Sequence, residues 1–234
     1  MLDNAVWGLL VVAAVTGTGP EPVVLVADGQ ARAVVVIADE PTEVAKYAAT
    51  ELVYHVEKAT GVRLPVVREG ELPKEPASRV YLGTTEAAKA HIEVAEISSD
   101  SFVLRTVGDS LYVVGRDSDG SPLSPDTRAG TLFGVYQLLE DVLGVRWLWP
   151  GELGEHVPAA RTVSVPPLDK TVAPRLVIRR LRSTLRQWEG LAGSEDSFSR
   201  EALAKAKADE AKWLRRQRMG HSRAMRWGHA FTGW

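Results

Sequence analysis

The stretch LLEDVLGVRWLWPGELGEHVP, residues 138–158, decides the fold of this chain. Its apolar helical pattern meets Gly144, becomes the aromatic strand VRWLW (145–149), and ends in a Pro-Gly turn. A glycine that ends a helix can adopt a left-handed conformation, which lets the chain fold back onto a sheet. We therefore interpret the stretch as a packing unit of a scaffold rather than as part of an active site.

The same pattern occurs earlier, where EKATGVR (57–63) resembles EDVLGVR (140–146). Thr42 can cap a helix over residues 43–60, and Gly61 supplies its stop signal. A second helix is expected over 128–143, and because it is apolar on almost every side it should be buried. Each unit is predicted to lay one helix against a sheet.

Alternating apolar runs predict the strands of that sheet. Asp28-Gly29 and Gly108-Asp109 mark hairpin turns between pairs of runs, and Pro65 places its own run at a sheet edge. The expected strands are VVLV (23–26), AVVVIA (33–38), VRLPVV (62–67), RVYLG (79–83), SFVLRTV (101–107), SLYVVGR (110–116), VRWLW (145–149) and RTVSV (161–165). Long helices among hairpins predict an α+β (α/β) fold, a mixed β-sheet with helices on one face.

The ends of the chain differ from this central unit in composition. Residues 1–22 contain an apolar run followed by small residues, typical of a signal peptide, although no Lys or Arg precedes Arg32. We expect the first domain at 23–166 and a linker at 167–174. The segment 175–234 then reads as strand, loop and charged helix, the way a β/α repeat begins.

Charge supports a boundary near Pro174. Residues 1–173 hold 14 Lys/Arg and 24 Asp/Glu, whereas residues 174–234 hold 14 and 6, so net charges of −10 and +8 meet there. The absence of cysteine excludes disulfides, thiolate metal sites and a cysteine nucleophile. We find no zinc-ligand spacing, nucleophile elbow or phosphate loop, and no close Asp-Glu pair on a strand end, so no metal or cofactor is predicted.

The segment TRAGTLFGVYQLLEDVLGVRWLWPGELGEHVP (127–158) resembles the N-terminal α/β domain of α-glucuronidases, β-N-acetylhexosaminidases and a related uncharacterised family of bacterial extracytoplasmic proteins. The resemblance includes YAATELVYHVEKATGVRLPVV (47–67) and RVYLG (79–83). It also includes WLRRQRMGHSRAMRWGHAF (213–231), which is closest to the uncharacterised family. It implies that 23–166 is the non-catalytic domain of such a glycoside hydrolase. It also implies that 175–234 begins a truncated (β/α)₈ (TIM) barrel.

The resemblance implies a carbohydrate partner, a location outside the cytoplasm, and two sugar contacts in the complete protein. Arg179 matches an arginine that binds sugar hydroxyls, although Leu176 and Ile178 replace the family's aromatic residues. His229 would lie near the end of the second barrel strand, where the active sites of this fold gather. The catalytic carboxylates would lie beyond Trp234, so we expect a fragment that is not an enzyme by itself.

Two other readings remain open. The chain could be a stand-alone carbohydrate-binding module that uses exposed tryptophans (Trp147, Trp149, Trp188 and Trp234). It could also bind nucleic acid through the basic residues of its C-terminal segment (Lys205, Lys207, Lys212, Arg215, Arg216, Arg218, Arg223 and Arg226). We favour a basic helix face that packs against the acidic first unit, with no nucleic-acid partner and no membrane span. A truncated barrel should leave Trp213 and Trp227 exposed.

Overall fold

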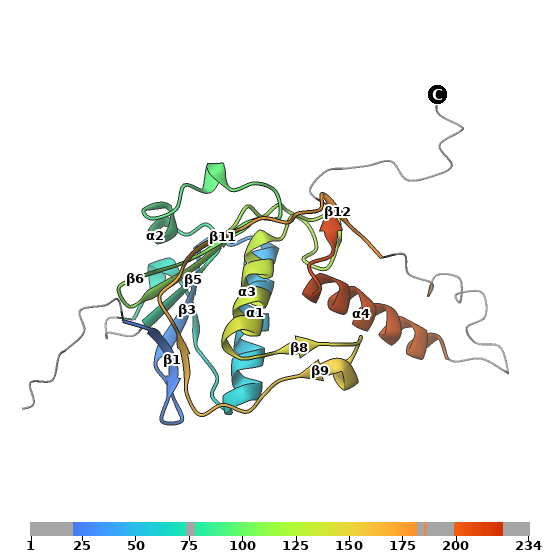
Figure 1. The fold of residues 1–234 in the computed structure, drawn as a ribbon, viewed down its shortest axis with the longest axis horizontal. Coiled ribbons are helices and arrows are strands. Elements are labelled where there is room, and N and C mark those ends of the chain that lie inside the picture. The colour runs from blue at the N-terminus through green and yellow to red at the C-terminus, as the bar shows by residue number, and fades with distance from the viewer. Residues whose placement is uncertain (1–20, 74–77, 182–184, 186–198, 222–234) are drawn as a thin grey trace, which may run out of the picture.

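A six-stranded mixed sheet forms the centre of the molecule in the computed structural model, which describes residues 21–73, 78–181, 185 and 199–221 (Figure 1). Four neighbouring strands pair in parallel, and two more strands, joined by antiparallel pairing, extend one edge. In spatial order the strands are β11 (Asp169–Val172), β6 (Phe102–Val107), β7 (Ser110–Gly115), β5 (Ser78–Leu82), β3 (Ala33–Ile37) and β4 (Val66–Arg68). The predicted mixed-sheet α+β class is confirmed.

Two long helices cover one face of this sheet, α1 (Glu43–Thr60) and α3 (Gly130–Val142), and they lie side by side (Figure 1). α1 begins and ends where the sequence predicts. The Thr42 hydroxyl accepts a hydrogen bond from the Ala45 amide, and Gly61 closes the helix with a φ of 75°. Gly144, after α3, has a φ of 69°, so both glycine stops are left-handed as expected.

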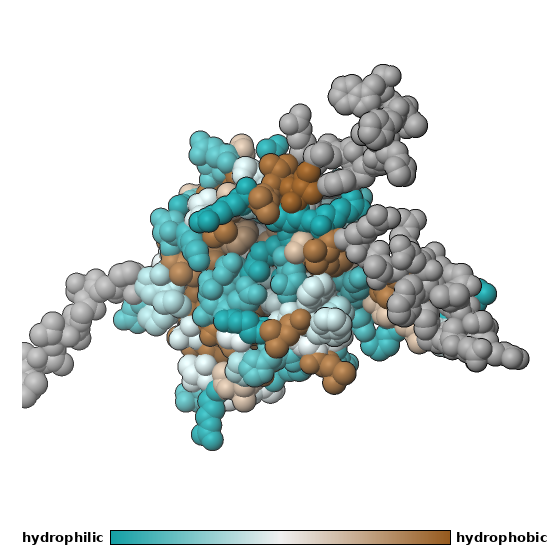
Figure 2. All heavy atoms as spheres, turned by 45° about the vertical axis from the view of Figure 1, so that its right-hand side comes forward, coloured by the Kyte–Doolittle hydropathy of each residue, from teal (hydrophilic) through white to brown (hydrophobic). Residues whose placement is uncertain are grey.

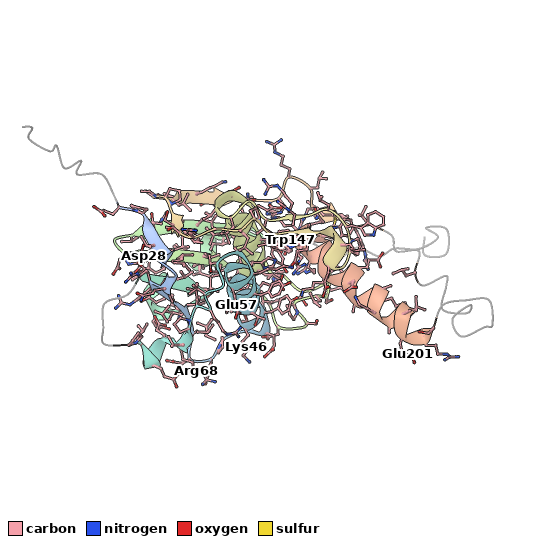
Figure 3. All side chains as sticks on the ribbon, turned by 90° about the horizontal axis from the view of Figure 1, so that it is seen from below. Asp28, Lys46, Glu57, Arg68, Trp147 and Glu201 are labelled. Carbon is pink, nitrogen blue, oxygen red and sulfur yellow. The ribbon has the colours of Figure 1, made fainter. Side chains whose placement is uncertain are left out.

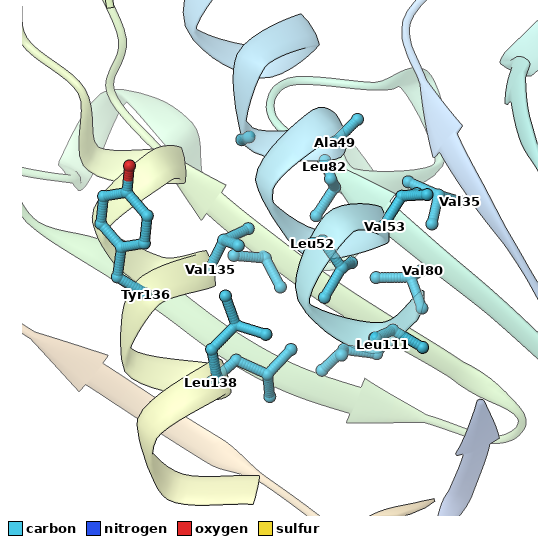
Figure 4. Packing of buried hydrophobic residues seen from close by; sticks show 14 of the residues in the cluster. Val35, Ala49, Leu52, Val53, Val80, Leu82, Leu111, Val135, Tyr136 and Leu138 are labelled. Carbon is cyan, nitrogen blue, oxygen red and sulfur yellow. The ribbon is translucent and has the colours of Figure 1, made fainter. Parts of the chain in front are cut away.

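Apolar side chains fill the space between the sheet and the two long helices (Figure 4). Alternate residues of each strand point to opposite faces. In β3, Val35 therefore belongs to the same buried cluster as Leu52 of α1, whereas Val34 and Val36 face the other side. That second face is covered by the short helix α2 (Glu86–Lys89) and the residues after it. Burial on both faces explains why β3 reads as an unbroken apolar run.

The predicted first hairpin divides between two sheets. The Asp28-Gly29 turn joins β1 (Val23–Ala27) to β2 (Gln30–Ala31), but β3 leaves to join the central sheet. β1 also pairs with β10 (Val163–Val165), which closes a three-stranded sheet at one end of the core. The hairpin at Gly108-Asp109 forms between β6 and β7 as predicted.

The predicted linker at 167–174 contains a strand. Within it, β11 pairs antiparallel with β6, register Asp169 to Arg105, and extends the central sheet. An exposed row of backbone donors and acceptors on β6 explains this, because a sheet edge readily accepts another strand. Residues 169–172 of the predicted linker therefore extend the sheet of the first unit, and the domain boundaries themselves stay a prediction.

The C-terminal segment packs on the first unit instead of standing apart from it. Its elements are β12 (Ile178–Arg179), α4 (Arg200–Arg216) and β13 (Gly220–His221). β12 and β13 pair antiparallel, whereas neighbouring strands of a (β/α)₈ barrel are parallel. The barrel start therefore stays a prediction that the described residues do not display.

A small hairpin lies alongside α4 (Figure 1). It consists of β8 (Arg146–Trp147) and β9 (Glu155–His156), two strands that pair antiparallel. Trp147, labelled in Figure 3, lies where the hairpin meets the C-terminal half of α4, and Glu201 lies at the far end of that helix. The opening stretch thus packs against the C-terminal segment, but its predicted strand VRWLW (145–149) is shorter than expected and pairs in this hairpin instead of in the central sheet.

Candidate functional site

The predicted site residue Arg179 holds the C-terminal segment onto the sheet. Its Nη2 donates to Asp100 Oδ2 at 2.7 Å. Nε donates to the carbonyl of Arg218 at 2.9 Å, and Nη1 to the carbonyl of Leu176 at 2.7 Å. All three guanidinium nitrogens are therefore used within the chain. Contact with sugar stays a prediction, and the other predicted residue, His229, lies outside the described residues.

The structure brings together polar residues at the interface between α1, α3, the β8–β9 hairpin and α4. α4 begins at Ser199, whose hydroxyl accepts from the Ala202 amide, and its C-terminal turn carries Arg215 and Arg216. Successive helical residues point about 100° apart. The two arginines therefore enter different parts of the first unit, and both are buried.

Arg216 lies between two buried carboxylates, and we call these residues with their partners the Arg216 cluster. Arg216 Nε donates to Glu51 Oε2 at 3.0 Å, and Nη1 donates to Glu155 Oε2 at 2.6 Å. Lys212 lies 3.4 Å from Glu51, and Lys58 donates to Glu155 at 2.7 Å. The cluster joins α1, β9 and α4 through ion pairs that are largely removed from water.

His55 completes the cluster and has a defined tautomer. Its Nδ1 lies 2.7 Å from the Glu51 carbonyl oxygen, which can only accept, so Nδ1 carries the hydrogen. The Trp147 indole donates to Nε2 at 3.2 Å. Glu155 Oε2 lies 3.6 Å from the same Nε2, which is beyond hydrogen-bond distance. His55 thus orients the Trp147 ring beneath the Arg216 guanidinium, whose carbon lies 5.4 Å from the ring centroid.

The electrostatics of the Arg216 cluster oppose acid–base catalysis. Burial on its own raises the pKa of Glu155, but the neighbouring His55, the hydrogen bonds from Lys58 and Tyr54, and the charge of Arg216 outweigh burial and hold that pKa well below its usual range. A general acid needs a proton at its operating pH, with a pKa near that pH. Glu155 is ionised and accepts hydrogen bonds on both oxygens. The pair of carboxylates therefore binds cations of the chain.

Arg215 occupies a different environment, which we call the Arg215 clamp. Its guanidinium donates to three backbone carbonyl oxygens, those of Pro122 at 2.9 Å, Thr127 at 2.9 Å and Met219 at 2.6 Å. It also lies over the Phe133 ring, 4.8 Å from the centroid, and the residue is 1% exposed. Because burial disfavours the charged form, the pKa of Arg215 is lowered to about 10. The polar loop 117–127 is folded around this side chain.

Two carboxylates lie at the end of the sheet that faces the Arg215 clamp. Asp100 precedes β6, and Asp117 follows β7 at the same edge of the sheet. Gly115 and Gly130 let β7 approach α3 closely, since a Cβ on Gly115 would lie 2.2 Å from the Gly130 carbonyl carbon. At this edge the Thr131 amide donates to Asp117 Oδ1 at 3.0 Å.

Two hollows of the described surface lie away from both arginines. A groove of about 210 Å³ lies between α3, β6 and β11 and is lined by Leu138, Asp141 and Lys170, among others. Another, of about 270 Å³, lies beside β4 and is lined by Pro65, Val67 and Pro73, among others. Neither contains residues of the Arg216 cluster or the Arg215 clamp.

Two sequence expectations about tryptophans need correction. Trp147 is 4% exposed, so it offers no surface to a sugar. Trp213 is half-buried against the core and donates to the Trp147 carbonyl at 2.9 Å, so its predicted exposure is wrong. Trp149 is 71% exposed as the binding-module reading requires, whereas Trp188, Trp227 and Trp234 lie outside the described residues.

Sequence reasoning missed Glu51, His55 and Glu155. A signal was present for the first two, because they lie 4 and 8 residues after the partly buried Tyr47, on the same face of α1. Charged or polar residues at such positions need partners when buried. Glu155 gave no such signal, since it lies in a loop-rich stretch far from α1 in the sequence.

Comparison with known proteins gives no family model that matches the chain and no match among curated proteins. Several solved structures are similar to it. One is a family GH115 4-O-methyl-α-glucuronidase with specificity for decorated arabinogalactans, with 17% identity, a TM-score of 0.46, and coverage of 67% of this chain and 19% of that one. Another is the GH20 β-N-acetylhexosaminidase from Streptomyces coelicolor, with 18% identity, a TM-score of 0.33, and coverage of 63% and 24%.

A third similar structure is the chitobiase of Flavobacterium johnsoniae, with 13% identity, a TM-score of 0.37, and coverage of 68% of this chain and 20% of that one. All three neighbours are glycoside hydrolases, and this chain spans about a fifth to a quarter of their length. No helix in the described ranges is long and apolar enough to cross a membrane.

Proposed function

We propose that this chain is the supporting N-terminal domain of a glycoside-hydrolase-like protein of polysaccharide degradation, followed by the first part of its catalytic barrel, and is not catalytic by itself. The motifs in 47–67, 79–83 and 127–158 support the family, and they occupy α1, β5 and the α3–β8–β9 unit. An extracytoplasmic location and a carbohydrate substrate for the complete protein belong to the same proposal.

The observation that carries the supporting role is the use of Glu51 and Glu155. Glycoside hydrolysis needs two carboxyl groups that face a sugar, one of them able to hold a proton. Here the two carboxylates face Arg216, and each has a second cation nearby, Lys212 or Lys58. Both carboxylates therefore attach α4 to the sheet unit. A domain that supports the domain after it requires such an attachment.

The test is a hydrolysis assay on the chain as given, with chromogenic β-N-acetylhexosaminides and α-glucuronides. We expect rates equal to those of buffer, because the carboxylates are ion-paired and buried. Turnover that disappears in a Glu51→Gln or Glu155→Gln variant would overturn the proposal, since it would show that these groups reach a substrate. Turnover unchanged in both variants would also contradict it and would place the activity elsewhere in the chain.

A second candidate, the carbohydrate-binding module, is favoured by one observation. The tip of the β8–β9 hairpin presents Trp149, Leu148 and Leu153 to solvent, and the tip backbone is tight because a Cβ on Gly154 would lie 2.1 Å from the Trp149 carbonyl oxygen. A rigid exposed indole can stack on a sugar ring. Figure 2 shows that apolar side chains form small separate groups on the face it displays.

Tryptophan fluorescence during titration with oligosaccharides separates the two candidates. A binding module should respond, and Trp149→Ser should abolish the response while the neighbouring Leu153→Ser variant keeps it. If the chain is a supporting domain, the original chain, Trp149→Ser and Leu153→Ser should all show no saturable fluorescence response.

The nucleic-acid reading loses part of its basis. Of the basic residues that could contact phosphates, Arg215 and Arg216 are buried within the chain, and Arg218 pairs with Glu140. Arg223 and Arg226 lie outside the described residues. The absence of a nucleic-acid partner stays a prediction, which salt-dependent retention on DNA would contradict.

A further inference from the structure

Two residues at the junction between the first unit and the C-terminal segment have a left-handed backbone although neither is glycine. Of the three non-glycine residues with positive φ in the described ranges, Asp28 lies in the β1–β2 hairpin turn. The other two are Asp100, with a φ of 60°, and Arg218, with a φ of 57°. A side chain crowds the backbone in this conformation, so it persists only where surrounding contacts hold it, and such places are often switch regions.

Arg218 ends α4 at a position where most helices have glycine. The amide of Met219 donates to the carbonyl of Leu214 at 2.9 Å, and the amide of Arg218 donates to the carbonyl of Arg215 at 2.8 Å. This pair of bonds is a Schellman stop, whose left-handed residue is usually glycine. In this chain a glycine follows two residues later, at Gly220. The helix therefore stops before it reaches the stop signal of its own sequence.

Contacts from two sides hold Arg218 in this position. Its Nη2 donates to Glu140 and, at 3.3 Å, to Gln137, both on α3. Its carbonyl oxygen accepts from Nε of Arg179 at 2.9 Å. The bonds to α3 fix the side chain, whereas the bond from Arg179 acts on the backbone that has the unusual conformation.

Asp100 is held by the same arginine. It is the third residue of a turn that the amide of Ser101 closes on the carbonyl of Ser98 at 3.1 Å, a place where a positive φ favours glycine or asparagine. Asp100 Oδ2 accepts from Arg179 Nη2 at 2.7 Å, and Oδ1 has no hydrogen-bond partner among the described residues. The Asp100 side chain is 1% exposed. One guanidinium therefore contacts both left-handed residues, one in each unit.

We propose that Arg179 is the positioning residue of a two-state junction between the first unit and the C-terminal segment. While its guanidinium bridges Asp100 and Arg218, the backbone of Arg218 stays left-handed and α4 ends at its C-cap, Gln217. When the bridge opens, α4 continues to the glycine stop at Gly220, and β13 separates from β12. This inference concerns the junction alone and does not depend on the proposed function.

The two states differ in the direction in which the chain leaves α4. Each helical residue turns the chain by about 100° and advances it by about 1.5 Å. Two further helical residues therefore rotate the exit by about 200° and move it by about 3 Å. In the closed state Gly220 packs beside Arg215, since a Cβ on it would lie 2.9 Å from Arg215 Nη1. Both states thus use the missing side chain of Gly220, and the first unit selects between them through Asp100.

Arg179→Met in the full chain tests the junction, because it removes the bridge and keeps the apolar bulk. NMR scalar couplings report the sign of φ at residue 218, and hydrogen exchange reports local opening. We expect φ at 218 to become negative, and exchange to rise about fivefold or more both in the turn 98–101 and at 220–221. The exposed neighbour Arg180 is the matched control, and Arg180→Met should change neither. A positive φ retained at 218, or a rise on one side only, overturns the proposal.

Arg179→Lys separates the two halves of the bridge. An ammonium is a point charge that can pair with Asp100 but cannot span two acceptors as a planar guanidinium does. We expect the turn 98–101 to keep its exchange rates in this variant, whereas φ at 218 becomes negative. A positive φ at 218 would show that the Nε bond does not hold the backbone there, which contradicts the proposal.

Asp100→Asn tests whether the first unit acts on the helix end. Asparagine tolerates a left-handed backbone but cannot form the ion pair, so Arg179 is held less firmly. We expect hydrogen exchange at 217–221 to rise, although the substitution lies in another unit. Asp119→Asn, at an exposed carboxylate, is the control and should have no effect there. Unchanged exchange at 217–221 in Asp100→Asn overturns the coupling, and this measurement remains if Arg179→Met does not fold.

Arg218→Gly provides a rescue experiment. Glycine adopts a positive φ without strain, so the stop at 218 no longer needs Arg179. In this background Arg179→Met should leave the end of α4 at Gln217. A helix that lengthens equally with and without the glycine would assign the stop to other contacts and overturn the proposal.

Discussion

Arg215 and Arg216 are neighbours in the sequence, yet the protein binds them in opposite ways. Arg216 meets two carboxylates, and although burial lowers its pKa, the charge and hydrogen bonds of Glu51 and the charge of Glu155 raise it overall. Arg215 meets neutral carbonyls, and burial lowers its pKa to about 10. Removal from water is similar for both side chains, so the difference lies in the charge of the partner. The comparison shows that one helix end can be attached by ion pairing on one side and by backbone hydrogen bonds on the other.

The largest expected effect comes from Arg216→Met, which leaves Glu51 and Glu155 without their shared cation. Breaking a buried ion pair from one side costs about 3–5 kcal/mol. We expect this loss in the docking of α4, measured as faster hydrogen exchange of α4 amides relative to those of α1. The control Lys212→Met removes a partly exposed cation from the same carboxylate and should cost about 1 kcal/mol or less. Equal effects of the two variants would contradict the comparison.

Arg215→Met at neutral pH should have the next largest effect. A hydrogen bond with one charged partner contributes about 1.5–3 kcal/mol to stability. The carbonyls of Pro122 and Thr127 would each lose such a bond. Because water can replace part of the lost bonding, we expect the variant to lose about 2–3 kcal/mol of unfolding free energy. Hydrogen exchange in the loop 117–127 should rise together with that in α4. Arg200→Met, at the exposed end of α4, should change neither. Hydrogen exchange that rises in α4 but not in the loop would show that Arg215 does not hold the loop in place.

Glu155→Gln tests the ion-paired side by its pH dependence. The folded pKa of Glu155 is lowered, so its charge stabilises the fold above the ordinary value of 4.5, and this contribution is lost as the pH falls below that value. We expect the variant to lose about 1.5–2 kcal/mol at neutral pH, as one charged hydrogen bond would. The difference from the original chain should shrink in acid, as followed by urea unfolding. A difference that stays constant down to about pH 3 would show that the charge of Glu155 is not what holds Arg216.

The smallest effect should come from Trp213→Phe, because Trp213 attaches α4 to the β8–β9 hairpin through one hydrogen bond to the Trp147 carbonyl, and Gln217 donates to the same carbonyl. Loss of that bond with most of the ring retained should cost about 1 kcal/mol in thermal or urea unfolding. The exposed Trp149→Phe serves as control and should lie within about 0.5 kcal/mol of the original chain. A cost for Trp213→Phe as large as that for Arg216→Met would make the indole, and not the ion pairs, the main attachment.

Much of the first unit could be predicted from short-range signals. Thr42 and Gly61 bound α1, Gly144 ends the second long helix, and Gly108-Asp109 turns between β6 and β7. Each signal acts within a few residues, because a cap or a turn depends on local backbone conformation. The choice of a strand's pairing partner does not depend on local backbone conformation. The sequence therefore did not indicate that β3 leaves its hairpin for another sheet, or that residues of the predicted linker form β11.

The candidate site was less predictable than the fold. Arg179 was singled out by resemblance, yet its observed contacts are with Asp100 and two carbonyls of its own segment. A basic helix face packing against the acidic unit was foreseen from charge alone. The sequence did not show which arginines are buried, because arginine side chains are mostly exposed to solvent in folded proteins.

The sequence by itself indicated the two long helices, most of the runs that form strands, and that acidic and basic parts attract each other. Only the tertiary structure decided that Arg216 reaches Glu51, 165 positions away, while its neighbour Arg215 reaches carbonyls 88 and 93 positions away. The physical reason is that helix and turn signals are local, whereas the environment of a buried charge depends on which distant groups the packed chain places within hydrogen-bond distance of it.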